Sequence, residues 1–328
     1  MDLNTLLFLL VGVLVVGYAV LDGFDLGVGI VSLFARSQEE RNLHVAAIGP
    51  VWDGNEVWLL ATGNMLFGAF PLVFTTVFSG FYLAFMLLLA ALVARAVAME
   101  FRLLHPSPLW VRFWDGAFAL GSLASAFLLG MAVGNVLRGV PVGPDFVWQG
   151  SFVGLLNPYG LLIGLVSCVL LLMHGAIYLW MKTEGQLSDR LKRTALYAYS
   201  VFLPLYGVAI AATVFVSPSL FRKTDSLVLW GFITLLAVAL AAIPFMIRTG
   251  MKRVAFLASS ASVALIIIVT ASSVYPVLIP SSLDPEWSLT IYNTASAPGT
   301  LLLMLLIALV GLPIILGYTF AVYRVFRA

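Results

Sequence analysis

Runs of about 20 or more mostly apolar residues recur along nearly the whole chain. A helix of about 20 apolar residues crosses the hydrocarbon core of a bilayer, which is about 30 Å thick. Hydrophobic residues make up 62% of the 328 residues and charged residues only 10%, which leaves too few polar side chains for a water-exposed surface. The sequence therefore predicts an all-α polytopic membrane protein. Its nine predicted spans lie at about 5–34, 45–70, 74–101, 113–138, 158–181, 193–216, 227–248, 254–279 and 299–326.

The first apolar run is expected to stay in the protein as a span. Met1-Asp2-Leu3-Asn4 contains no basic residue, and the run that follows has no small-residue cleavage site, so the pattern is not that of a signal peptide. The single cysteine, Cys168, lies inside a predicted span. A disulfide within the chain is therefore excluded.

Lysine and arginine are distributed unevenly between the two ends of the predicted spans. One side has thirteen of them: Arg36, Arg41, Arg102, Arg112, Lys182, Arg190, Lys192, Arg193, Arg248, Lys252, Arg253, Arg324 and Arg327. The other side has Arg138, Arg222 and Lys223, and Arg95 within a span completes the 17 basic residues. Because basic residues gather on the cytoplasmic side, we expect the N-terminus outside and the C-terminus in the cytoplasm of a bacterial or archaeal cell, with the chain in the inner membrane. No basic stripe or motif indicates a nucleic-acid partner.

Four acidic residues fall within the first two predicted spans, in the half nearer the cytoplasm. Asp22 and Asp25 lie in the first, and Asp53 and Glu56 lie at the start of the second. A carboxylate at the centre of a membrane helix costs on the order of 3 kcal/mol even on the lenient insertion scales, so such groups are protonated, hydrated or paired. Four acids on two consecutive helices indicate a route for protons or cations that opens toward the cytoplasm.

The spacing of these acids predicts two carboxylate couples. Residues three apart lie on one face of a helix, which places Asp22 beside Asp25 and Asp53 beside Glu56. Desolvation and like-charge repulsion both favour the neutral acid, so we expect one member of each couple to hold a proton near neutral pH. The alternative is a purely structural role, in which the acids cap helix ends or pair with basic residues, namely Arg36, Arg41 or Arg95.

Ligands for metals and haem are scarce in this chain. The three histidines, His44, His105 and His174, are far apart in the sequence, and no two of them share a predicted helix. There is no CxxCH motif, no zinc-protease motif and no phosphate-binding loop. We expect no metal site and no catalytic residue in this chain.

Several motifs in a fixed order point to a known family. VLDGFDLGVG at 20–29, PVWDGNEVW at 50–58 and FSGFY at 78–82 are followed by GNVLRGVP at 134–141, LNPYGLL at 156–162, YPVLIPSS at 275–282 and SLT at 288–290. Together they resemble subunit II of the cytochrome bd quinol oxidases. The resemblance covers about residues 5 to 325.

This resemblance implies both a fold and a role. The family fold is two four-helix bundles plus one peripheral helix, which we place at 1–140, 141–280 and 281–328. The complex oxidises quinol and reduces dioxygen to water, with haems b and d in subunit I. Subunit II is the haem-free partner, which stabilises subunit I and contributes to proton uptake from the cytoplasm and to oxygen access.

The resemblance also implies roles for individual residues. Asp53 matches a proton-relay carboxylate, with Asp22 and Asp25 as entrance or supporting groups. Trp58 matches a tryptophan near an oxygen path, and Trp52 is placed with it on that path or at the subunit interface. Ordinary core packing is the alternative for Trp58.

The third predicted span carries two further charges, Arg95 and Glu100. They are expected to pair across about one helical turn or to hold a polar group of the partner. A structural quinone occurs in this subunit in some members of the family and not in others. The sequence does not decide whether this chain binds one, or whether a small single-helix accessory subunit is a partner.

Two other functional classes also fit an acid-bearing membrane chain. A proton- or cation-coupled secondary transporter predicts broken helices with polar residues at matching positions in both halves, whereas here only the first half has the acids. A subunit that only shields its partner from lipid predicts that Asp53 can be replaced without loss of turnover.

Overall fold

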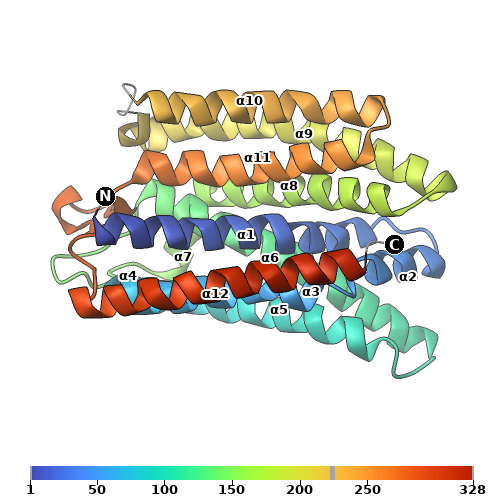
Figure 1. Ribbon diagram of the computed structural model, residues 1–328, viewed down its shortest axis with the longest axis horizontal. Coiled ribbons are helices and arrows are strands. Elements are labelled where there is room, and N and C mark those ends of the chain that lie inside the picture. The colour runs from blue at the N-terminus through green and yellow to red at the C-terminus, as the bar shows by residue number, and fades with distance from the viewer. Residues whose placement is uncertain (1, 222–225, 327–328) are drawn as a thin grey trace.

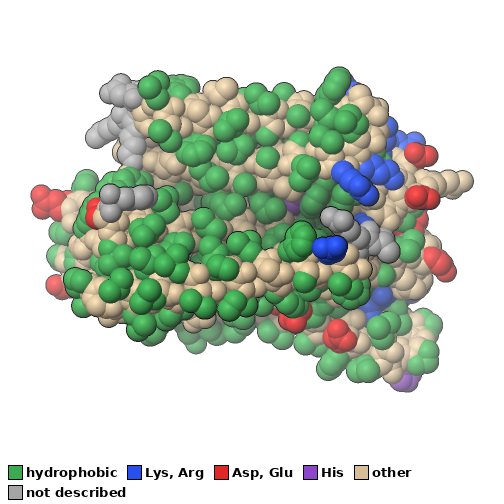
Figure 2. Space-filling view, viewed as in Figure 1, with side chains coloured by type: hydrophobic (Ala, Val, Ile, Leu, Met, Phe, Trp, Pro, Cys, Tyr) green, Lys and Arg blue, Asp and Glu red, His purple; other side chains and the backbone are tan. Residues whose placement is uncertain are grey.

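The computed structural model describes residues 2–221 and 226–326. Three of the basic residues used to predict the orientation, Arg222, Lys223 and Arg327, lie outside this part. The long helices run side by side along the long axis of the molecule, with the N- and C-termini toward opposite ends of that axis (Figure 1). In this view the visible Lys and Arg side chains gather toward the end at which the C-terminus lies (Figure 2).

Helices make up most of the described structure. They are α1 (Leu3–Ser32), α2 (Gln38–Ile48), α3 (Trp52–Ala69), α4 (Pro71–Gly80), α5 (Tyr82–Phe101), α6 (Pro108–Arg138), α7 (Phe152–Leu155), α8 (Pro158–Lys182), α9 (Gly185–Val216), α10 (Leu227–Arg248), α11 (Lys252–Val274) and α12 (Pro298–Val325). Two short strands, β1 (Val277–Ile279) and β2 (Leu289–Thr290), pair antiparallel in the connection between α11 and α12. The all-α polytopic prediction is confirmed.

Eight helices of the described chain are long and apolar enough to cross a membrane, and the bent pair α3–α4 makes a ninth candidate. The chain bends by 119° from α3 to α4. The break lies at Phe70, whose φ of −134° and ψ of 64° are not helical. Proline disfavours helical geometry in the residue before it, so Pro71 accounts for the break.

Three predicted spans differ from the observed helices. The span at 45–70 is divided into α2 and α3, because Gly49 and Pro50 interrupt the helical hydrogen bonds. The span at 74–101 is divided at Phe81 between α4 and α5. The span at 254–279 ends at Val274, where Pro276 follows and the chain continues as β1.

The helices form two groups with one helix alongside. Within the first group α1 packs on α3 and α6, and α5 packs on α6; in the second, α8 packs on α9 and α11, and α10 on α11. Helix α12 lies against α3 and α1 (Figure 1). The two groups meet along α8, which packs on both α6 and α1, and α1 crosses α8 at Gly27 and Gly175. A Cβ atom added at Gly27 would lie 2.0 Å from the carbonyl oxygen of Leu171, so this crossing requires glycine.

Candidate functional site: a buried charge cluster

The charged residues of the first helix group meet at one buried arginine. Arg95 on α5 is fully buried, and its Nη2 donates to Oδ1 of Asp22 on α1 at 2.8 Å. The same Nη2 donates to Oε1 of Glu56 on α3. Asp22 is also fully buried, whereas the Glu56 side chain is 26% exposed. One guanidinium thus connects three helices through two carboxylates.

The second acid of α1 binds an amide. Nδ2 of Asn55 donates to Oδ2 of Asp25 at 2.8 Å and to the carbonyl oxygen of Leu21 at 3.3 Å. Tyr323 on α12 donates its hydroxyl to Oδ1 of Asn55 at 3.2 Å. Asp25 is fully buried, so this chain of hydrogen bonds joins a buried acid to the half-buried Tyr323.

Local sequence explains how these groups converge. The interval of three residues puts Asp22 and Asp25 on one face of α1. Helix α3 starts at Trp52, directly after Gly49 and Pro50, so Asn55 lies near its N-terminus. The positive end of the α3 dipole therefore lies close to the acids of α1 and favours negative charge there.

The charge cluster, by which we mean Asp22, Asp25, Asn55, Glu56 and Arg95, contains more acid than base. Three carboxylates face one guanidinium. Buried polar atoms of the cluster lack a hydrogen-bond partner among the described residues: Oδ2 of Asp22, Oδ1 of Asp25, and Nε and Nη1 of Arg95. Buried polar atoms without a protein partner are costly unless water or a proton satisfies them. The cluster is therefore chemically suited to hold water and protons.

No hydrogen bond joins the two members of either predicted carboxylate couple, and each acid that forms a bond has its partner on another helix. Asp22 binds Arg95 and Asp25 binds Asn55, although both lie on one face of α1. Asp53 is exposed and has no hydrogen bond or ion pair with another described residue, whereas Glu56 turns inward to Arg95. The cause is their position on α3, because the helix presents Asn55 and Glu56 to the core and Asp53 to the outside.

The predicted pairing of Arg95 with Glu100 does not form either. Glu100 is exposed, and Arg95 forms its ion pairs with acids on two other helices. Of the structural alternatives for the acids, pairing with Arg95 is the one observed for Asp22 and Glu56.

Trp58 lies in the interior of the first group. It is 3% exposed, and a Cβ atom added at Gly17 on α1 would lie 2.1 Å from its ring. Gly17 thus leaves the space that the indole fills, as the core-packing alternative predicts. Trp52 is half-buried and packs against a hydrophobic core that contains residues of both helix groups, among them Phe24 and Tyr178. An oxygen path along these two side chains stays a prediction.

Helix α2 covers the end of the cluster's helix group and was not predicted as a separate element. Gln38 donates to Asp115 of α6 at 3.0 Å, and Asn42 accepts from Arg102 at 2.9 Å. Arg102 and Asp115 also form an ion pair at 2.9 Å. On the opposite side Glu40 pairs with Arg190 of α9. Helix α2 is therefore tied to both helix groups.

Two of the three histidines, His44 and His174, are buried and hydrogen-bonded within the protein. His174 is fully buried and uses both ring nitrogens, Nδ1 with Oγ of Ser259 at 2.8 Å and Nε2 with the carbonyl oxygen of Val20 at 3.1 Å. His44 on α2 contacts Oγ of Ser32 through Nδ1 at 3.0 Å, and burial lowers its pKa to about 4. No group of three His, Cys, Asp or Glu side chains in the described residues could hold a metal ion.

Sequence reasoning missed two members of this arrangement. Asn55 stands inside the PVWDGNEVW motif, between the two acids that drew attention, and its polarity within an apolar run is a usable signal. Tyr323 belongs to the last helix, more than 250 residues away, and no local pattern links it to Asn55.

Comparison with known proteins agrees with these observations. The family model described as cytochrome bd terminal oxidase subunit II matches residues 3–326. The chain is 36% identical to the cytochrome bd-I ubiquinol oxidase subunit 2 of Escherichia coli K12, over 95% of this chain and 91% of that protein. It is 35% identical to the cytochrome bd ubiquinol oxidase subunit 2 of Bacillus subtilis, over 99% and 96%.

A solved structure has the same fold. A chain of the bd oxidase from Geobacillus thermodenitrificans superposes with a TM-score of 0.77 at 18% identity, over 99% of both chains. At this identity the likeness establishes the arrangement of helices. With the family match over nearly the whole length, the chain belongs to the subunit II family of cytochrome bd terminal oxidases, as a multi-pass cell-membrane subunit of a quinol oxidase.

Proposed function

We propose that this chain is the haem-free partner of the haem-bearing subunit I and that its charge cluster takes part in proton uptake for dioxygen reduction. Haems b and d and the oxidation of quinol are assigned to subunit I. The N-terminus is placed outside and the C-terminus in the cytoplasm. This orientation puts the cluster in the cytoplasmic half of the membrane.

The excess of acid over base in the charge cluster is the observation that carries the proposal. Burying unpaired charge costs several kcal/mol per ion, by an order-of-magnitude estimate. A proton on one carboxyl group removes part of that charge, so the cluster gains by binding a proton and can pass it on. Arg95 limits the cost by neutralising one acid.

Exposure decreases in steps toward the cluster. Asp53 is exposed, Glu56 is 26% exposed, and Asp22 is fully buried. All three sit on α1 and the first turns of α3. This order suits a route in which Asp53 collects protons at the surface and Glu56 leads to the interior, with Asp22 and Asp25 as the buried acceptors.

The exposed apolar side chains of α3 and α5 suit contact with subunit I or with lipid. Leu60 is 66% exposed, Phe67 is 60% exposed, and Leu83 is 51% exposed. Oxygen access along this side, a bound structural quinone and a single-helix accessory subunit remain predictions. The division into two bundles at 1–140 and 141–280, with a peripheral helix at 281–328, is likewise our proposal, and the helix packing described above supports it.

The transporter alternative is less well supported. It predicts broken helices at matching positions in both halves. In the described residues the bent pair α3–α4 is the one broken span, and it lies in the first half.

The proposal is tested in membranes of a strain that depends on this oxidase. Asp53→Asn and Asp25→Asn are compared for quinol-driven oxygen consumption and for reduced-minus-oxidised haem spectra. Normal spectra with strongly reduced turnover support proton delivery. Asp189→Asn is the matched control, because Asp189 is exposed on α9, away from the cluster.

Other outcomes contradict the proposal in different ways. A lost haem d signal in Asp53→Asn makes Asp53 an assembly residue. Unchanged spectra with unchanged turnover in both variants exclude a relay and leave this chain a structural partner.

A further inference from the structure

A cavity of about 810 Å³ opens between the two helix groups at the end where α8 and α12 finish and α11 begins. The connection between α2 and α3 closes it on one side through Ala47, Pro50 and Val51. None of the five cluster residues lines the cavity, which adjoins the cluster through Tyr323, the donor to Asn55. Its volume is in the range of small-molecule sites.

The rim of the cavity is basic. Lys182, Lys252 and Arg253 line it, and Glu184 is the one acid among the lining residues. Lys252 is held in place, because its Nζ donates to the carbonyl oxygen of Thr183 at 2.6 Å and to Oγ of Ser188 at 3.0 Å. The rim therefore attracts anions.

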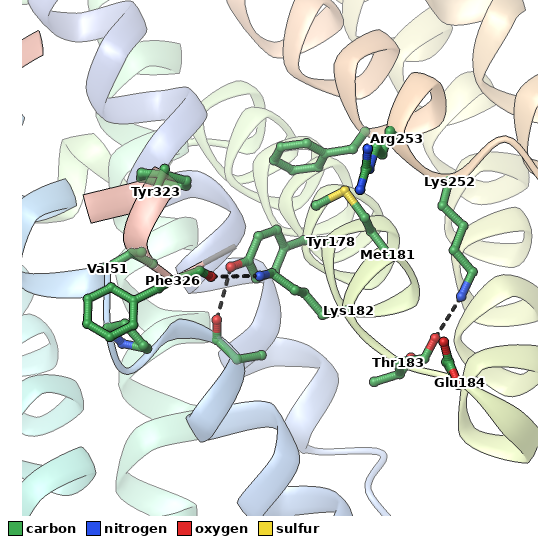
Figure 3. A pocket seen from close by; sticks show the side chains of 13 residues that line it. Val51, Tyr178, Met181, Lys182, Thr183, Glu184, Lys252, Arg253, Tyr323 and Phe326 are labelled. Atoms are coloured by element: carbon green, nitrogen blue, oxygen red, sulfur yellow. Dashed lines mark hydrogen bonds between the residues drawn. The ribbon is translucent and has the colours of Figure 1, made fainter. Parts of the chain in front are cut away.

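Arg253 is the basic residue of the rim that is available to a ligand. It is exposed and has no hydrogen bond or ion pair with another described residue. Lys182 is engaged, since its Nζ donates to the carbonyl oxygen of Phe326 at 3.2 Å. Figure 3 shows these two side chains at separate points of the cavity, Arg253 next to Met181 and Lys182 next to Phe326.

The walls of the cavity are apolar and aromatic. Met181, Tyr178 and Phe256 line it, and the hydroxyl of Tyr178 is turned to the carbonyl oxygen of Ala47 at 2.9 Å. The cavity thus combines a basic rim with an apolar wall between membrane-spanning helices. A ligand that matches both parts carries an anionic group at one end and hydrocarbon at the other.

We propose that this cavity binds the phosphate group of an anionic phospholipid, with Arg253 as the residue that contacts the phosphate. Basic pockets between membrane helices on the cytoplasmic side suit the headgroups of such lipids. Guanidinium groups bind phosphate through paired N–H donors. The hydrocarbon wall distinguishes a lipid from a soluble phosphate, which would gain nothing from Met181 and Phe256. The site goes beyond the proton pathway proposed above and does not depend on it.

Lipid retention is the quantity that tests the proposal. The full protein, purified with the subunits that accompany it, is delipidated and re-equilibrated in detergent micelles that contain phosphatidylglycerol and phosphatidylcholine in equal amounts. Bound lipid per protein is counted by mass spectrometry. We expect preferential retention of phosphatidylglycerol and an approximately fivefold weaker retention in Arg253→Gln, the effect of one basic side chain near an anionic surface.

The control is Arg248→Gln. Arg248 is exposed at the end of α10, close in sequence to the rim, and does not line the cavity. It is expected to retain lipid as the unmodified protein does. Thermal unfolding of both variants checks that each is folded, and the exposed position of Arg253 predicts no loss there.

Two results overturn the proposal. If Arg253→Gln retains as much phosphatidylglycerol as the unmodified protein, Arg253 does not contact the lipid. If phosphatidylcholine is retained as well as phosphatidylglycerol, the site does not select an anionic headgroup. In a separate arm, glycerol 3-phosphate is added at millimolar concentration. If this soluble phosphate fully displaces phosphatidylglycerol, the cavity binds free phosphate groups and the assignment to lipid is wrong.

Discussion

The first helix group buries charge, whereas the second buries neutral side chains. Asp22, Asp25 and Arg95 are fully buried in the first. In α8 to α11 the fully buried polar residues of the described chain are His174, Ser259 and Ser262, and each is hydrogen-bonded. Both groups are similar in length and apolar composition. Buried charge is therefore not a requirement for packing four helices in this fold.

The two helix groups also differ in whether their helices are interrupted. The first group contains the bent pair α3–α4, and the site residues Asn55 and Glu56 stand near the start of α3. The second group has prolines inside helices, Pro204 in α9 and Pro244 in α10, yet both helices continue. Interrupted helices and buried charge thus coincide in one half. Since buried ion pairs stabilise little compared with apolar packing, their presence in that half points to function.

The strongest test of this difference removes the one buried base. Arg95→Met leaves Asp22 and Glu56 without their partner, and breaking a buried pair in this way costs about 3–5 kcal/mol. We expect a large decrease in thermal stability in detergent and in the amount of protein in the membrane. Arg248→Met, at an exposed position, is the control.

A combined variant separates the cost of the unpaired acids from the cost of altered packing at Arg95. Arg95→Met with Asp22→Asn and Glu56→Gln removes both unpaired acids and is expected to recover part of the stability. If the single variant is as stable as the unmodified protein, the ion pairs do not hold the first group together.

A second test concerns α2, which connects the two groups. The pKa of His44 is lowered to about 4, mainly by burial, while Glu40 opposes that shift and Arg190 adds to it. The unfolded chain binds a proton on this histidine below about pH 6.5, whereas the folded chain does not. Folding stability should therefore fall as the pH decreases from about 6.5 to 4, by up to about 3 kcal/mol.

Thermal unfolding across this pH range measures the effect. His44→Gln should flatten the dependence, and His105→Gln, at an exposed position, should leave it intact. An unchanged slope in His44→Gln would show that other groups cause it. Glu40, whose pKa is lowered through its contacts with Arg190 and Arg36, acts at lower pH in all variants.

Sequence alone predicted most of the helices because the relevant signal is local. Apolar length and composition located α8, α10 and α12 to within two residues of their observed bounds. The same signal missed the break at Gly49 and Pro50 and the break at Phe81, which lie inside the spans predicted at 45–70 and 74–101. Hydropathy counts apolar residues, whereas these breaks depend on backbone geometry.

The sequence identified most of the residues of the charge cluster but not which of them bond to each other. Helical spacing correctly placed Asp22 and Asp25 on one face. It could not show that Arg95 from α5 and Asn55 from α3 would reach that face, because those contacts depend on how whole helices pack. For the same reason Asp53 and Glu56, three residues apart, were expected together and point in different directions.

The boundary between the two groups is tested by filling its glycine crossing. A methyl group at Gly27 would lie 2.0 Å from the carbonyl oxygen of Leu171 and 2.7 Å from the backbone nitrogen of Gly175. Gly27→Ala must push α1 and α8 apart, and we expect a loss of about 1–3 kcal/mol in unfolding free energy. Gly231→Ala, in α10 with nothing within 4 Å, is the control. Equal melting temperatures for both would show that the two groups separate without cost.

The smallest effect concerns the link from α12 to the buried acid. Tyr323→Phe keeps the ring and removes the hydroxyl that donates to Asn55, so the expected loss of stability is about 1 kcal/mol. Tyr318→Phe on the same helix is the control, because Tyr318 is half-exposed and has no hydrogen bond with another described residue. Without the hydroxyl, the oxygen of the Asn55 amide loses its donor, and the amide that binds Asp25 is held less firmly. The pH profile of oxygen consumption should therefore shift in Tyr323→Phe and stay in place in Tyr318→Phe. A small loss of stability with an unshifted pH profile would show that Tyr323 only helps to hold α12 in place. The protonation of Asp25 would then depend on its contacts within α1 and α3 alone.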